Sequence, residues 1–99
     1  MFVAVYSFKL KPNMEEQFQQ AWAERTKEII KASGSFGSRL HRNEDGTFVA
    51  YAQWPSRKAW ENAAPSETAA RDRMREATLS SETVFCLEVL EDLLVTQNQ

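Results

Sequence analysis

The amino-acid sequence predicts an α+β fold whose elements follow the order strand, helix, strand, strand, helix, strand. Apolar residues alternate along the first segment, a helical pattern with three- and four-residue spacing follows, and a hairpin signal precedes a second helical region. The chain has 99 residues, of which 42% are hydrophobic and 26% charged. We therefore expect residues 1–99 to form one globular domain.

The first strand is predicted over residues 2–10. Phe2, Ala4 and Tyr6 begin one face, while Val3 and Val5 begin the other. Because both faces begin with apolar side chains, we expect this strand to be central and covered on both sides.

A long helix should follow the first strand. Asn13 and Glu16 match a capping box, which predicts a helix running to about Lys31. Its apolar stripe is interrupted by Arg25, and Gly34 is expected as the left-handed residue after its end.

The middle of the chain reads as an antiparallel hairpin. Residues 36–42 and 47–54 are the two strands, and the turn between them contains Gly46, which can adopt positive φ without steric cost. A second helical region should then be split in two by Ala64-Pro65.

The two pieces of this second region have their own start signals. Ser56 is expected to cap a short helix over 57–63, and Ser66 a second helix ending near Ala77. Residues 84–90 are predicted to form the last strand, continuing towards Val95.

This order is that of a ferredoxin-like fold, with the helices on one face of a four-stranded antiparallel sheet. The other face would carry Val3 and Val5 with some of Gly37, Arg39, His41, Val49, Tyr51, Phe85, Leu87 and Val89. Since an apolar sheet face is rarely left in water, we expect a homodimer in which two sheets pack face to face.

Composition excludes several classes of function. The net charge of -2 gives no basic excess for binding nucleic acid. No apolar run approaches the roughly 20 residues that span a bilayer, and no signal sequence is evident, so we expect a soluble, cytoplasmic protein. The single cysteine, Cys86, lies in a strand-like run and is expected to be a small buried residue.

Two segments resemble the antibiotic biosynthesis monooxygenase family. The first is Gly34 to Arg42 with the Asp45-Gly46 turn, and the second is Ala52-Gln53-Trp54-Pro55-Ser56-Arg57-Lys58-Ala59-Trp60. The resemblance implies a dimeric α/β barrel with a pocket between the sheet and the two helical regions. It also implies cofactor-independent monooxygenation of a small phenolic, quinol or polyketide-like aromatic substrate, whereas a non-catalytic dimeric small-molecule-binding domain is the alternative.

Candidate site residues follow from this expected pocket. Tyr6 could orient a substrate or act in catalysis, or be a wall of the core. His41, the one histidine, has the pKa that suits proton transfer, although a solvent or interface position is an open alternative. The substrate-binding candidates are Tyr6, Phe8, Phe18, Trp22, Trp60 and Met74, while Trp54 is expected in the core.

No metal or cofactor is expected. One His and one Cys far apart in sequence do not form a ligand set, and the arginines at 71, 73 and 75 read as a solvated helix surface. Haem-degrading relatives use a strand-one Asn, a Trp and an iron-ligating His, but Tyr6 occupies the first position and no His follows Trp60.

An RNA-recognition module shares the same element order. Its third strand would carry glycine and a basic residue, which Thr47 to Trp54 lacks. We therefore exclude this class of function.

Overall fold

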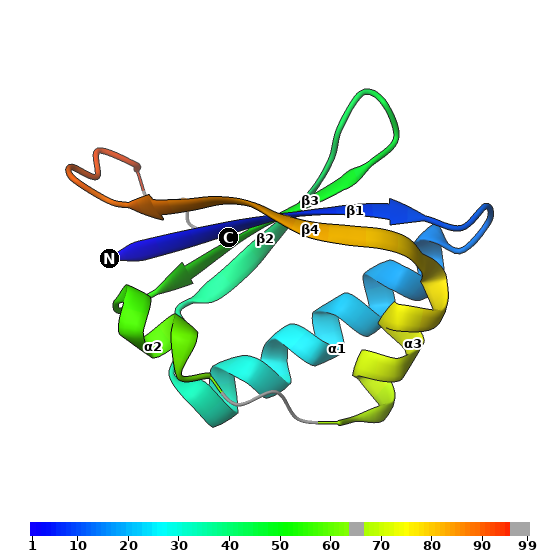
Figure 1. Ribbon diagram of the computed structural model, residues 1–99, viewed down its shortest axis with the longest axis horizontal. Coiled ribbons are helices and arrows are strands. Elements are labelled where there is room, and N and C mark those ends of the chain that lie inside the picture. Colours follow the sequence, from blue (N-terminus) through cyan, green and yellow to red (C-terminus); the bar gives the residue numbers. More distant parts are fainter. Residues whose placement is uncertain (64–66, 96–99) are drawn as a thin grey trace.

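The computed structural model describes residues 1–63 and 67–95. Figure 1 shows a four-stranded antiparallel sheet with helices against one face, which confirms the predicted ferredoxin-like α+β fold. The strand order is β2-β3-β1-β4. In chain order the elements are β1 (Phe2–Leu10), α1 (Glu15–Ser33), β2 (Gly37–Arg42), β3 (Phe48–Trp54), α2 (Arg57–Glu61), α3 (Ala69–Ala77) and β4 (Thr78–Glu88).

Strand β1 is central, as predicted. Its successive side chains point to opposite faces of the sheet, so every second one lies against the helices. Phe2, Ala4 and Tyr6 pack with Trp54 of β3 in one apolar cluster. A second cluster forms around Phe18 of α1, which packs with Phe48, Ala77, Phe8 and Leu10. These two clusters hold the sheet against the helices and set the walls of the space between them.

The predicted capping box at the start of α1 is wrong. The helix begins at Glu15, its N-cap residue is Met14, and no side chain of the described residues caps it. Asn13 instead adopts φ 64°, in the left-handed region that asparagine tolerates better than most residues. The other end follows expectation, because Gly34 has φ 73° and its N–H donates to the Ile30 carbonyl.

The hairpin and α2 agree with prediction to within two residues. Gly46 has φ 90° in the turn between β2 and β3. The Ser56 hydroxyl accepts a hydrogen bond from the Ala59 N–H at 3.1 Å, so it caps α2 as expected. The predicted break at Ala64-Pro65 and the predicted cap Ser66 lie outside the described residues, and α3 is capped by the Thr68 hydroxyl.

The prediction for the last strand is wrong at both ends. Strand β4 begins at Thr78, directly after α3, and ends at Glu88. It is an edge strand held to β1 by backbone pairing, with irregularities opposite Val5/Tyr6 and Lys9/Leu10. Because an edge strand has one neighbour, its side chains need not be buried, and Cys86, expected to be buried, is exposed.

The face of the sheet away from the helices carries the residues that alternate with the buried ones. Arg39 pairs with Tyr51 and His41 with Val49, and all four lie on this open face. Val3 is only 2% exposed there, whereas Phe85 and Leu87 of β4 are 56% and 44% exposed. Within residues 1–63 and 67–95, no helix has the length and apolar character to cross a bilayer.

Candidate ligand pocket

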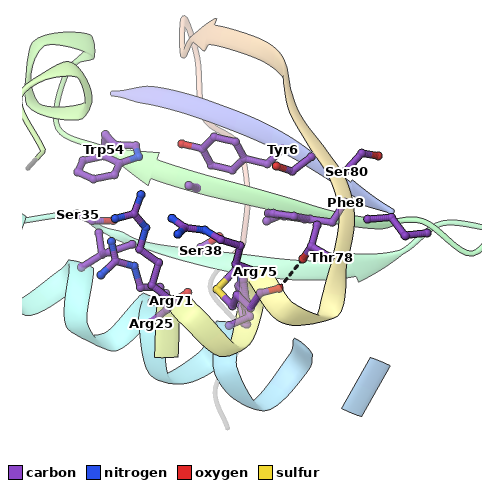
Figure 2. Close-up of a pocket in the computed structure, with 18 residues that line it drawn as sticks. Tyr6, Phe8, Arg25, Ser35, Ser38, Trp54, Arg71, Arg75, Thr78 and Ser80 are labelled. Atoms are coloured by element: carbon purple, nitrogen blue, oxygen red, sulfur yellow. Dashed lines mark hydrogen bonds between the residues drawn. The ribbon is translucent and has the colours of Figure 1, made fainter. Parts of the chain in front are cut away.

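A cavity of about 500 Å³ lies between the helix-facing side of the sheet and helices α1 and α3 (Figure 2). Tyr6, Phe8 and Trp54 contribute to its sheet wall. Helices α1 and α3 form the opposite wall with Trp22, Arg25, Ile29, Arg71, Met74 and Arg75. The volume and the aromatic lining are typical of sites for small organic ligands.

Tyr6 is held in the cavity wall by a hydrogen bond from a residue outside the lining, Trp60. The Trp60 indole N–H donates to the Tyr6 hydroxyl oxygen at 2.6 Å, and the Trp60 ring packs on Phe2 with 5.2 Å between ring centroids. Burial raises the pKa of the Tyr6 hydroxyl; the bond from Trp60 lowers it, and the nearby Cys86 thiol raises it. Tyr6 is therefore a neutral phenol near pH 7, and its own hydrogen remains available for donation.

Trp54 presents an unused hydrogen-bond donor to the same cavity. Its side chain is buried, at 4% exposure, and its indole nitrogen has no hydrogen-bond partner among the residues that the structure describes. Figure 2 shows that nitrogen turned towards the cavity. A buried donor left unpaired costs about 1–3 kcal/mol, so an acceptor brought by a ligand would be favourable at this point.

Three arginines make the helix wall cationic. Arg25, Arg71 and Arg75 extend from α1 and α3 towards the sheet (Figure 2). Arg25 lies 3.6 Å from Glu28 and Arg71 lies 2.9 Å from Glu67. In the described part of the chain Arg75 makes no ion pair, and the cavity lining includes no Asp, Glu or His.

Four of the six predicted substrate-binding residues line this cavity, namely Tyr6, Phe8, Trp22 and Met74. Phe18 does not, because it is fully buried against Phe8 and Phe48, with ring centroids 4.9 and 5.7 Å apart. Trp60 lies behind Tyr6 rather than in the lining. The structure thus places Trp60 as a support for Tyr6.

His41 is not brought together with Tyr6. It lies on the open face of the sheet, where its Nδ1 is 3.0 Å from the Val49 carbonyl oxygen. The cavity lies on the opposite face. Proton transfer by His41 within this single-chain cavity therefore has no geometric support.

Sequence reasoning missed the polar residues of the cavity. Arg73 and Arg75 are exposed, as expected for a solvated helix surface, whereas Arg71 is half-buried. Arg71 and Arg75 nevertheless line the cavity, while Arg73 bonds Glu24 of α1 away from it. Two features of the sequence indicate these polar residues. Arg25 interrupts an apolar stripe, and Arg71 and Arg75 are four residues apart and therefore share a helix face. Trp54 is in the core as predicted, but its unpaired N–H has no signature in sequence.

The described residues contain no group of three or more His, Cys, Asp or Glu side chains placed to hold a metal ion. The family model described as antibiotic biosynthesis monooxygenase matches residues 1–77. No curated protein matches the sequence.

Two solved structures illustrate the similarity of fold. SnoaB from Streptomyces nogalater, described as a cofactor-independent oxygenase, superposes with a TM-score of 0.75 at 19% identity, covering 93% of this chain and 95% of its own. Rv0793 from Mycobacterium tuberculosis gives a TM-score of 0.71 at 15% identity, covering 94% and 98%. At these identities the similarity shows a shared fold and nothing more specific.

Proposed function

The chain belongs to the antibiotic biosynthesis monooxygenase family, and from this premise we propose that it oxygenates a small phenolic, quinol or polyketide-like aromatic substrate without a metal or organic cofactor. The description of SnoaB as a cofactor-independent oxygenase supports the reaction type. The size and the aromatic lining of the cavity support the substrate class.

The proposed reaction converts a ring C–H ortho or para to a hydroxyl group into a carbonyl. One oxygen atom of O₂ enters the ring and the other leaves as water. The substrate loses four electrons and O₂ gains four, so no further reductant is required. The ionised substrate is the electron-rich species that reacts, and its stabilisation is therefore the main task of the protein.

The observation that carries the proposal is the pair of donors on the sheet wall. The Trp54 N–H is buried without a partner among the described residues, and Tyr6 is a neutral phenol oriented by Trp60. Both donors can bind the oxygen of an ionised substrate, while the cationic wall favours its negative charge. Since no Asp, Glu or His of the described chain lines the cavity, the substrate proton would pass to water.

An oxygen electrode with a panel of quinols and anthrones tests this proposal. We expect one O₂ consumed per substrate oxidised, and a rate at least about tenfold lower in Trp54→Phe, because one donor to the developing anion is lost. Arg73→Gln is the matched control, since Arg73 bonds Glu24 outside the cavity, and it should retain the rate. No uptake above the protein-free rate with any substrate would contradict the proposal.

A second candidate is a non-catalytic domain that binds a small aromatic molecule in the same cavity. The lining, which has no Asp, Glu or His from the described residues, favours this candidate because a general base is the group that proton abstraction normally uses. Saturable binding of the aromatic panel without O₂ uptake would identify it.

We also propose that the protein is a homodimer in which a second copy covers the open face. Phe85 and Leu87 are about half exposed there, and the segment after β4 exposes Leu90, Leu93, Leu94 and Val95 at 89%, 82%, 71% and 86%. Exposed apolar surface of this kind is typical of an interface, and a standard one hides about 800 Å² per partner.

A further inference from the structure

We infer that the cavity selects aromatic ligands that carry a carboxylate, with Arg71 and Arg75 binding that group on the helix wall. This rests on the proposed function only in taking the ligand to be an aromatic ring system. It adds a carboxylate to the ligand, a group that the proposed reaction does not require.

The charges around the cavity carry the inference. Three guanidinium groups line it, and no carboxylate of the described residues does so. Glu28 and Glu67 each pair with one arginine, but Glu67 is 76% exposed, so its bond to Arg71 is solvated. Arg75 has no ion-pair partner within residues 1–63 and 67–95. The site is thus locally positive on a chain whose net charge is -2.

A bound ligand changes the energetics of these arginines. A ring that fills the cavity displaces water from the guanidinium groups, and a neutral ring would offer them only a weaker cation–π contact in return. A carboxylate would replace the lost water with charge-assisted hydrogen bonds. An anionic ligand is therefore favoured over its neutral counterpart.

The chemistry of the walls selects a carboxylate attached to a ring. The guanidinium fork matches the planar carboxylate with two parallel bonds. Phe8, Trp22 and Met74 supply apolar surface for the ring. The unpaired Trp54 N–H is a second, independent indication of a ligand, because a buried donor requires an acceptor such as a phenolic oxygen.

Equilibrium binding tests the inference without requiring turnover. The probes are the hydroxynaphthoic acid with hydroxyl and carboxyl at opposite ends of the ring system, and its carboxamide, a neutral analogue of nearly the same shape. Calorimetry should show the acid binding at least about tenfold more tightly than the amide. Arg71→Gln and Arg75→Gln should each reduce this ratio, and the double variant should bring it close to one.

Arg73→Gln is the control, since it removes a charge from the same helix without touching the cavity. It should keep the preference for the acid. A wild-type protein that binds acid and amide equally, or a double variant that keeps the preference, would overturn the inference. Circular dichroism of each variant separates loss of binding from loss of fold.

The outcomes also separate this inference from the proposed function. Preference for the acid with no O₂ uptake would support the carboxylate site and contradict the oxygenase. O₂ uptake with equal affinity for acid and amide would contradict the carboxylate site alone. Binding of neither probe, together with no uptake, would contradict both.

Discussion

Tyr6 illustrates how one side chain obtains its chemical state from its neighbours. Burial keeps its hydroxyl protonated, while Trp60 occupies one lone pair of the oxygen and fixes its direction. Trp54 lines the same cavity with a donor that has no partner in the described chain. The Tyr6 hydroxyl is thus oriented before a ligand binds, and the Trp54 N–H is available to a ligand. Together they suit a ligand that carries an oxygen acceptor.

The raised pKa of Tyr6 predicts a loss of stability in alkali. The unfolded chain releases the Tyr6 proton at about pH 10, whereas the folded chain retains it to higher pH. Its contribution to stability should be intact below about pH 10 and be lost as pH rises through the folded pKa. Urea unfolding at about pH 9 and about pH 11 should show a smaller decrease in Tyr6→Phe than in wild type. Equal decreases would refute this assignment.

At the scale of elements, local patterns predicted β1, the hairpin and both ends of α2 to within two residues, because alternation and Ser56 act through neighbouring residues. Strand β4 was misplaced because its first half, Thr78 to Thr83, has a polar pattern and is fixed by pairing with distant β1. Residues 90–95 carry the apolar pattern of a strand but do not form one.

Substitutions at Asn13 distinguish the observed turn from the predicted capping box. With φ at 64°, Asn13→Gly should be at least as stable as wild type, whereas Asn13→Ser should lose about 1 kcal/mol of unfolding free energy. Chemical denaturation measures both. A capping role would instead leave the Ser variant unchanged, since serine is as good an N-cap residue as asparagine.

For the whole molecule, the arrangement of sheet and helices decides which predicted residues meet. Alternation on β1 correctly turns Tyr6 and Phe8 towards the helices, where they line the cavity. The place of Arg71 and Arg75 depends on how α3 packs against α1 and the sheet, which local sequence does not encode. Likewise, local sequence does not determine the sheet face of His41, whereas its pairing with Val49 places it on the open one.

The proposed dimer predicts a change of mass when the open face is made polar. Sedimentation of the wild-type protein should give about twice the chain mass of 11.4 kDa. Phe85→Glu should shift the protein towards one chain mass, because it places a charge in the buried interface. Lys58→Glu, on α2 away from that face, is the control for added negative charge. A monomeric wild type at high concentration would contradict the dimer.

The most direct test of the ligand pocket follows the indole N–H signals of the three tryptophans in a proton–nitrogen correlation spectrum, each assigned by substitution with phenylalanine. On titration with the hydroxynaphthoic acid, the Trp54 signal should move strongly downfield, because its N–H, which has no acceptor within residues 1–63 and 67–95, then donates to the ligand. The Trp60 signal should move far less, since Tyr6 already accepts its bond. Saturable binding that leaves the Trp54 signal in place would contradict the account.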